Sequence, residues 1–197
     1  MNKMAIFFSL LCFCSASSIQ AAGLEFTPWF GSSFSTNLKS STNTSNSISL
    51  NNARNYGFSI AWQDTPNGQG MLQINRVTHD FTSAIDNKTH SLDIIYAHFN
   101  GVAQFKQQQY ITTVSIGFGA TIAKSGATRK TFPSFTSALG TRYEYNKHLA
   151  LVTEARVYAS LIDKNDQLFC QNSVCSAKFG NALWFESIVS VGIAYKF

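Results

Sequence analysis

The sequence has no apolar run long enough to cross a membrane as a helix. Its most apolar segment, residues 5–13, is about half the roughly 20 residues that a spanning helix needs. Yet 45% of the residues are hydrophobic and 14% are aromatic, with 17 Phe among them. This apolar content is spread in alternation and not in blocks. The pattern therefore favours β-strands with one apolar face.

Two further absences exclude classes of function. The 15 Lys and Arg against 10 Asp and Glu give a net charge of +5, but the basic residues are scattered. No basic stripe is interleaved with aromatics, so we expect no nucleic-acid partner. No cluster of ligands surrounds Cys170 and Cys175, so we expect neither a metal site nor a cofactor, and no catalytic motif is evident.

The N-terminus has the layout of a secretory signal peptide. Lys3 precedes the apolar residues 5–13, and small residues follow up to Ala22. We expect cleavage after Ala21, with Ala22 as the alternative, which leaves residues 22–197 as one domain. Export into an oxidising compartment predicts that Cys170 and Cys175 form a disulfide. The loop it closes is short, so its entropic effect on stability should be small.

The last stretch of the chain, Leu183–Phe197, is a two-faced strand. One face is apolar and ends with Val191, Ile193, Tyr195 and Phe197. The other face is small or charged, apart from Trp184 and Ile188. At 15 residues this strand is much longer than the usual length of about five or six.

The same alternation predicts eight strands, at residues 24–35, 55–63, 70–78, 90–105, 110–123, 132–145, 149–162 and 183–197. Long connections at 36–52, 80–89, 124–131 and 163–181 alternate with short turns at 64–68, 106–109 and 146–148. Bacterial membrane barrels have an even strand number, short periplasmic turns and longer external loops. We therefore predict an all-β, eight-stranded, antiparallel, up-and-down transmembrane barrel. The competing fold, a soluble secreted β-sandwich, does not account for such long strands with aromatic faces.

Charged residues indicate which face of each strand points inward. Placing Arg or Lys toward lipid at mid-membrane costs about 2–4 kcal/mol, and an eight-stranded interior is filled by side chains. A three-residue turn at 146–148 would set Glu154 opposite Gly140 and diagonal to Arg142. We therefore expect an ion-pair network in the interior, formed by Arg142, Glu144, Glu154, Arg156 and Glu186. Glu25 and Asp93 are further candidate members. The alternative is a polar permeation path.

Two strands carry less regular patterns. In residues 90–105 we expect the side chains of Leu92, Ile94 and Tyr96 to point outward and Asp93 inward. In residues 70–78, Arg76 falls on the apolar face, which predicts either a bulge or the edge of the membrane at that point.

Several segments resemble the small eight-stranded outer-membrane β-barrel proteins of Gram-negative bacteria, broadly the outer membrane protein A and opacity-protein type. They are EFTPWFG, NYGFSIAW, SLDIIYAHFNG, SFTSALGTRYEY, LALVTEARVY, and the FCQNSVC loop before the Phe-ended strand. The resemblance implies an integral outer-membrane barrel with outer-membrane lipid as its surroundings. It also implies recognition by the barrel-assembly machinery through Val191, Ile193, Tyr195 and Phe197. It implies no particular activity.

Three functions follow as hypotheses. The first is a structural or surface-interaction role, with the loops at 36–52 and 163–181 exposed to an unknown surface ligand. The second is a lipid A-modifying enzyme, for which His79, His90 and His98 are the candidate catalytic residues. The third is a narrow solute channel. We favour the first, with a non-enzymatic barrel whose interior is filled.

Overall fold

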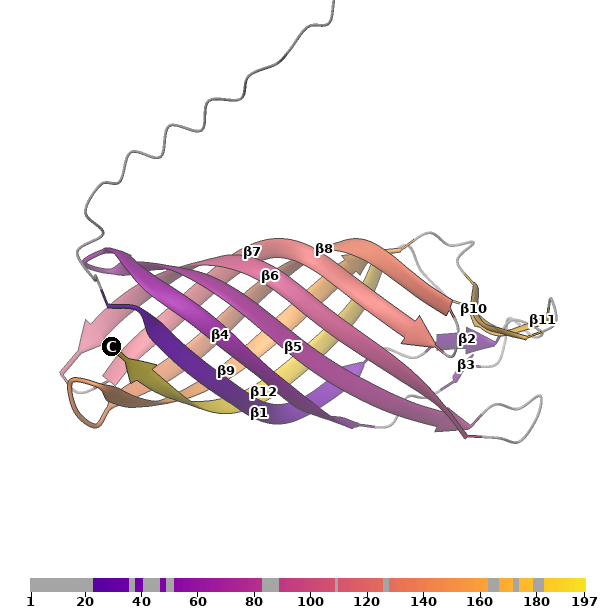
Figure 1. Cartoon of the computed structure of the whole chain (residues 1–197), viewed down its shortest axis with the longest axis horizontal. Coiled ribbons are helices and arrows are strands. Elements are labelled where there is room, and N and C mark those ends of the chain that lie inside the picture. Colours follow the sequence, from indigo (N-terminus) through magenta and orange to yellow (C-terminus); the bar gives the residue numbers. More distant parts are fainter. Residues whose placement is uncertain are drawn as a thin grey trace, which may run out of the picture.

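The computed structural model describes residues 23–35, 38–40, 47–48, 52–82, 89–108, 110–125, 128–162, 167–171, 174–178 and 183–197. The predicted signal peptide, residues 1–21, and its cleavage point lie outside these ranges. The described chain consists of strands joined by turns, and eight of the strands form a closed antiparallel barrel in the order β1-β12-β9-β8-β7-β6-β5-β4 (Figure 1). The prediction of an eight-stranded, up-and-down, all-β barrel is confirmed.

The barrel strands follow one another along the chain, and the last one pairs with the first. Their bounds are β1 Glu25–Ser35, β4 Ala53–Thr65, β5 Gly68–Thr82, β6 Thr89–Gln107, β7 Tyr110–Ser125, β8 Thr128–Glu144, β9 Leu149–Leu161 and β12 Leu183–Lys196. Closure occurs between β1 and β12, where Glu25 lies opposite Lys196 and Ser35 opposite Glu186. Within the described residues, no helix is long and apolar enough to cross a membrane.

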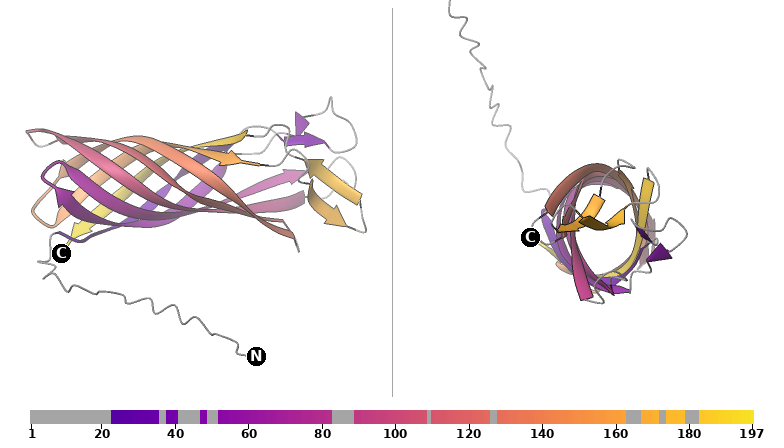
Figure 2. Two further views of the ribbon diagram at one scale, coloured as in Figure 1. Left: turned by 90° about the horizontal axis from the view of Figure 1, so that it is seen from above. Right: turned by 90° about the vertical axis from the view of Figure 1, so that its right-hand side faces the viewer.

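The two ends of the barrel differ. Short turns, the start of β1 and the end of β12 share one end (Figures 1 and 2). There the backbone N–H of Phe197 donates to the carbonyl of Leu24 at 3.0 Å. A small second sheet lies beyond the opposite end. We call the first end the turn end and the second the loop end.

The second sheet was not expected from the sequence. It has the order β10-β11-β2-β3 and consists of β2 Leu38–Ser40, β3 Ser47–Ile48, β10 Gln167–Gln171 and β11 Val174–Lys178. The predictions of loops at 36–52 and 163–181 are therefore wrong for the residues of these four strands. The two contributing loops follow β1 and precede β12, which are neighbours, so their backbones can pair and satisfy each other's hydrogen bonds. In the β10–β11 hairpin the backbone register sets Cys170 opposite Cys175.

The turns agree with the sequence more closely. Tyr145 N donates to the carbonyl of Leu149 at 3.0 Å, which closes a turn at residues 146–148. The expected register follows, with Gly140 opposite Glu154. Strands near the loop end run further than predicted, since β5 reaches Thr82 and β8 already begins at Thr128. Their outward residues there are polar, so the apolar alternation stops before the strand does.

Over most of its height the outer wall is apolar. Exposed outward side chains include Phe30, Phe58, Leu72, Phe99, Ile116, Phe118, Phe135, Leu139, Val189 and Val191. Exposed aromatic side chains surround the turn end, among them Trp62, Phe105, Tyr110, Tyr145, Tyr195 and Phe197. An apolar band bordered by aromatic residues is the lipid-facing surface of outer-membrane barrels.

Toward the loop end the polarity of the two faces inverts. The interior there holds a buried apolar cluster that includes Val77, Leu92, Ile94, Phe132, Tyr158, Trp184 and Ile188, beside the buried polar side chains of Ser33, His79 and Glu186. The outward neighbours are polar, as at Arg76 and Asp93, which form an ion pair at 2.8 Å. Nearer the centre the interior is polar, with Gln73, Asn100 and Thr136 buried, and smaller apolar clusters around Val152 and Met71 lie toward the turn end.

This inversion corrects the prediction for β6. Leu92, Ile94 and Tyr96 point inward and are buried, and Asp93 lies on the outer wall. The alternation along β6 is as predicted, but the face that carries the apolar residues points into the barrel and not toward lipid. Beyond the lipid-facing band the outer wall is polar, so β6 there buries its apolar face inside like a strand of a soluble barrel. The same inversion explains Arg76, which lies at the edge of the apolar band without any register shift between β5 and β6.

Candidate functional site in the barrel interior and at the loop-end rim

A buried arginine occupies the centre of the interior. Arg156, on β9, is 1% exposed. It donates to both carboxylate oxygens of Glu154, from Nε at 2.7 Å and from Nη2 at 2.8 Å. Its other hydrogen bonds go to Thr136 on β8 at 3.1 Å, Ser115 on β7 at 3.2 Å and Asn100 on β6 at 2.9 Å. These partners come from three other strands, so this one side chain links four strands of the barrel.

Between this arginine and the loop end lies a stack of aromatic rings. Tyr158 lies against Tyr96 with the ring centroids 4.0 Å apart and the planes 14° apart. His98 contacts Tyr158 at 5.1 Å between centroids and shares a 2.8 Å hydrogen bond with Ser134. Asn75 donates to the Tyr158 hydroxyl at 2.5 Å. The stack joins the polar centre to the apolar cluster at the loop end.

A second carboxylate lies beyond the stack. Glu186 is 1% exposed and accepts hydrogen bonds from Ser33 and, at 2.6 Å, from the Tyr96 hydroxyl. Its Oε1 lies 3.2 Å from Nε2 of His79. The same Nε2 is 2.8 Å from the Ser35 hydroxyl. Glu186, on β12, is therefore held by side chains from three other strands, β1, β5 and β6.

At the turn end an ion pair spans the lumen. Arg142 on β8 lies 2.6 Å from Glu25 on β1 and 3.3 Å from Glu144. A cavity of about 30 Å³ lies between this pair and the Glu154 carboxylate. That volume is enough for roughly two water molecules. Side chains from β1, β8 and β9 therefore extend into the lumen around this cavity.

The five residues of the predicted network fall into separate groups. Arg156 pairs with Glu154, and Arg142 with Glu144 and Glu25. Glu154 does not bind Arg142, the expected diagonal partner, because the adjacent Arg156 takes both of its oxygens. Glu186 contacts neither arginine. The prediction that Asp93 joins this network is wrong, because Asp93 lies on the outer wall of the barrel.

Sequence reasoning missed the polar partners that hold these charges. Ser33, Asn75, Tyr96, Asn100 and Ser115 all point inward, and alternation alone could have placed most of them there. What it could not give is which of them meet, because that depends on the stagger between strands far apart in the sequence.

The three candidate histidines all lie on the inward side of the barrel wall. His79 and His98 are buried inside the barrel. Ser33, Ser35 and Glu186 all contact the same nitrogen of His79, Nε2. In a nucleophile–His–acid triad the serine and the acid contact opposite ring nitrogens, so this group is a hydrogen-bond cluster. His90 lies on the inward face of β6, whereas its neighbours Ser91 and Asp93 face outward.

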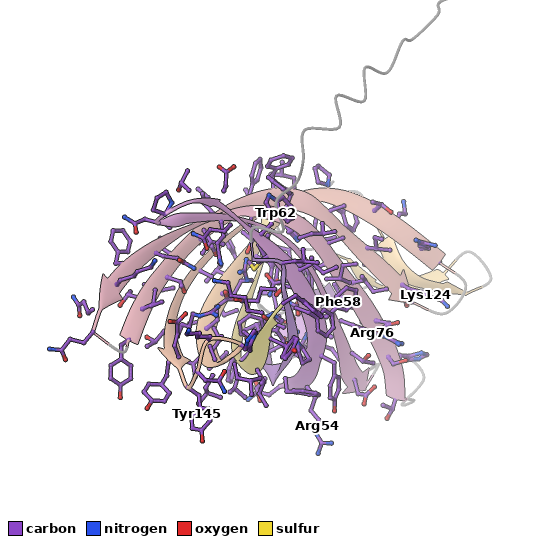
Figure 3. The ribbon with its side chains drawn as sticks, turned by 60° about the vertical axis from the view of Figure 1, so that its left-hand side comes forward. Arg54, Phe58, Trp62, Arg76, Lys124 and Tyr145 are labelled. Atoms are coloured by element: carbon purple, nitrogen blue, oxygen red, sulfur yellow. The ribbon has the colours of Figure 1, made fainter. Side chains whose placement is uncertain are left out.

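The outer wall at the loop end carries a group of exposed charges. Thr78, Asp93, Lys124 and Arg129 lie in one row across β5, β6, β7 and β8. Arg76 reaches this row by a bidentate pair with Asp93, and Arg54 lies on neighbouring β4. We call Arg54, Arg76, Lys124 and Arg129 the basic rim. Figure 3 shows Arg76 and Lys124 projecting outward from the wall, far from Tyr145 at the turn end. Among the described residues no group of His, Cys, Asp and Glu is placed to hold a metal ion.

Comparisons with solved structures agree on the fold. The crystal structure of Neisserial surface protein A matches with a TM-score of 0.58 at 12% identity, covering 89% of this chain and 97% of that one. Ail, the attachment invasion locus protein of Yersinia pestis, solved with the heparin analogue sucrose octasulfate, matches with a TM-score of 0.52 at 12% identity, covering 89% and 99%. No protein-family model and no curated protein sequence matches the chain. The chain therefore has the fold of eight-stranded outer-membrane barrels, which agrees with the resemblance found in its sequence.

Proposed function

We propose that this protein is an integral outer-membrane barrel that is closed to solutes and acts through its external end. In this proposal it is exported by the leader ending at Ala21. The barrel-assembly machinery then inserts it by recognising Val191, Ile193, Tyr195 and Phe197. All four side chains lie outward on the closing strand and are exposed, as that recognition requires.

The single observation that supports closure is the filling of the interior. The Arg142–Glu25 pair crosses the lumen at the turn end, Arg156 extends into it at the centre, and an apolar cluster lies at the loop end beside the buried Glu186 and His79. An ion moving along the axis would have to break buried pairs or enter an apolar layer, and either is costly. The channel hypothesis is therefore the weaker one.

Planar-bilayer recording tests this proposal. We expect refolded wild-type protein to give no conductance steps, with a general porin as the positive control. Tyr158→Ala removes a ring from the central stack and should introduce small steps. Val157→Ala, the outward neighbour on the same strand, is the matched control and should stay silent. Regular steps from the wild type would contradict closure.

The surface role depends on the second sheet and its loops. Cells expressing the protein would be compared with cells in which residues 38–48, residues 167–178 or both are replaced by Gly/Ser linkers. Adhesion would be measured on heparin and on extracellular matrix, because the Yersinia neighbour was solved with a heparin analogue. Adhesion that is the same with and without these segments would exclude an adhesive role and leave a structural one.

We infer that the protein is not a lipid A-modifying enzyme. The supporting observation is that His79 and His98 point into the lumen, away from the wall that lipid would contact. Mass spectrometry of lipid A from overexpressing and deletion strains checks this inference. Identical lipid A species are expected, and a new or missing acyl chain would refute it.

A further inference from the structure

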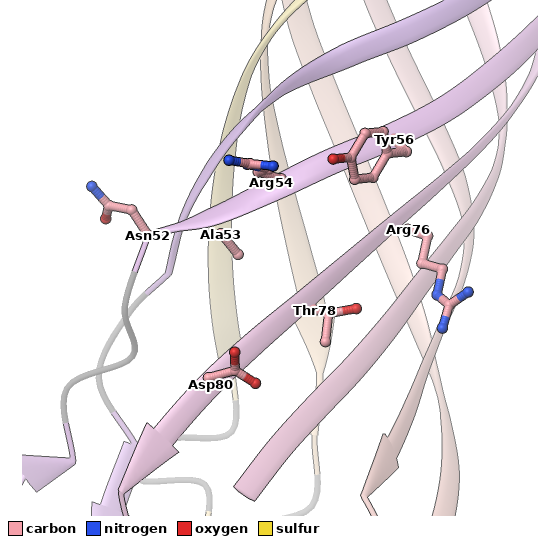
Figure 4. Close-up of a pocket in the computed structure, with 7 residues that line it drawn as sticks. All are labelled: Asn52, Ala53, Arg54, Tyr56, Arg76, Thr78 and Asp80. Carbon is pink, nitrogen blue, oxygen red and sulfur yellow. The ribbon is translucent and has the colours of Figure 1, made fainter. Parts of the chain in front are cut away.

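A hollow on the outer wall at the loop end has no part in the closed interior. It lies between β4 and β5, has a volume of about 590 Å³ and is lined by Arg54, Tyr56, Arg76, Thr78 and Asp80, together with Asn52 and Ala53 (Figure 4). Arg54 and Tyr56 extend from one strand and Arg76, Thr78 and Asp80 from the next. The hollow is open to the outside of the barrel, not to its lumen.

The hollow lies at the edge of the apolar band. On β4 the outward residues after Arg54 are Tyr56, Phe58 and Ile60, and Tyr56 packs edge-to-face on Phe30 with the ring centroids 6.0 Å apart. Arg76 lies opposite Tyr56 across the β4–β5 pair. A tyrosine between an apolar wall and a charged one marks the level of lipid headgroups. Both arginines are therefore at the height where lipid phosphates lie.

The arginines retain unused hydrogen-bond donors. Arg76 gives Nε and Nη2 to Asp93, which fixes the guanidinium plane and leaves Nη1 without a bond to any described residue. Its side chain is 64% exposed. Arg54 forms no ion pair within the described part of the chain. A guanidinium held by one carboxylate and open on its other edge is well suited to a phosphate.

The surrounding charge also favours an anion. The basic rim contributes four cations, and among the residues that the structure describes Asp80 and Asp93 are the two carboxylates on the same stretch of wall. The difference is two positive charges, next to an apolar surface that would contact acyl chains. Charge and apolar contact together distinguish a lipid phosphate from a free anion.

We propose that Arg54 and Arg76, with Tyr56, form a binding site for the phosphate group of an outer-leaflet lipid. The phosphate accepts hydrogen bonds from both guanidinium groups, and the acyl chains lie along Phe58 and Ile60. The site requires the barrel to lie in the membrane but does not require its interior to be closed. A conducting barrel would leave it intact.

Native mass spectrometry of detergent-solubilised protein tests the site. Bisphosphorylated lipid A would be compared with the same lipid after removal of both phosphates. We expect the wild type to retain the phosphorylated form, and Arg54→Gln/Arg76→Gln to bind it roughly tenfold more weakly, as the loss of a charge-assisted contact predicts. Arg54→Lys/Arg76→Lys should retain most of the binding. Lys147→Gln, which removes an exposed cation at the turn end, should bind like the wild type.

Three results would overturn the proposal. The first is equal retention of the phosphorylated and dephosphorylated lipids. The second is loss of binding in Lys147→Gln to the same extent as in the double glutamine variant. The third is displacement of the lipid by inorganic phosphate or sucrose octasulfate at matched anion concentration, which would identify a site for soluble anions. A heat-modifiable gel band for each variant establishes that the barrel has folded.

Discussion

Replacing Arg156 by methionine tests how the interior is held. Methionine keeps an unbranched side chain of similar reach but removes the charge and all the hydrogen bonds. The Glu154 carboxylate then loses the two bonds of 2.7 and 2.8 Å that satisfy it. Asn100, Thr136 and Ser115 lose theirs as well.

The expected cost follows from the burial of the pair. Arg156 and Glu154 side chains are 1% and 8% exposed. Removing one partner of such a pair leaves an uncompensated charge and costs about 3–5 kcal/mol. Arg156→Met/Glu154→Gln leaves no charge behind, so we expect the double variant to recover about half of that loss or more. The free energy of unfolding should therefore fall in the order wild type, double variant, single variant.

Urea unfolding in lipid vesicles, followed by tryptophan fluorescence, measures these differences. Lys147→Met is the control for loss of a cation outside the interior, and its unfolding free energy should stay within about 0.5 kcal/mol of the wild type. The reasoning is refuted if Arg156→Met costs less than about 1 kcal/mol. It is also refuted if the double variant is no more stable than Arg156→Met alone, because then the unpaired carboxylate is not the source of the loss.

Three further predictions concern the wall, the hairpin and the orientation. Gly117→Ala should cost about 1–3 kcal/mol of stability, because a Cβ there would come within 2.3 Å of the Asn100 side-chain oxygen. Gly101→Ala is the control and should be neutral, because a Cβ there meets nothing within 4 Å. An equal loss of stability in the two variants would contradict this prediction. Cys170 and Cys175 should resist alkylation until the protein is reduced, as mass spectrometry would show. Two free thiols in exported protein would contradict the disulfide. In a background with serine at both cysteines, Lys147→Cys should stay unlabelled by a membrane-impermeant maleimide on intact cells and become labelled after lysis.

The barrel itself was predictable because each strand carries its own evidence. A strand facing lipid on one side must alternate, and a short turn fixes the register of its hairpin, as with Gly140 opposite Glu154. The pairing of Arg142 with Glu25 was not predictable in the same way, although both residues were expected in the interior network. Glu25 lies 117 residues earlier and meets Arg142 across the lumen, so no local pattern records the contact.

The errors at the loop end share one physical cause. Residues 80–82 and 128–131 were expected in loops, and Leu92 and Ile94 were assigned to the outer wall. Each prediction assumed that an outward residue meets lipid along the whole strand. Where β5 to β8 continue past the lipid-facing band, an outward polar residue and an inward apolar one are the stable arrangement. The second sheet was missed for a different reason, since its strands of two to five residues are too short for any period to be seen.

The change in polarity locates the outer boundary of the lipid-facing band on both faces of the barrel wall. On the outer wall the change occurs between Tyr56 and Arg54 and at Arg76. In the interior it occurs between Asn75, which is polar, and Val77, which belongs to the apolar cluster. Residues 75–77 are consecutive on β5, so both faces change character at the same height. A lumen that carried water through the membrane would have no reason to gain a buried apolar cluster at the level where the outer wall becomes polar, although the buried group around Glu186 and His79 stays polar here. A barrel whose projecting end must be stable in water does have that reason, because its strands there can bury apolar side chains only on the inside.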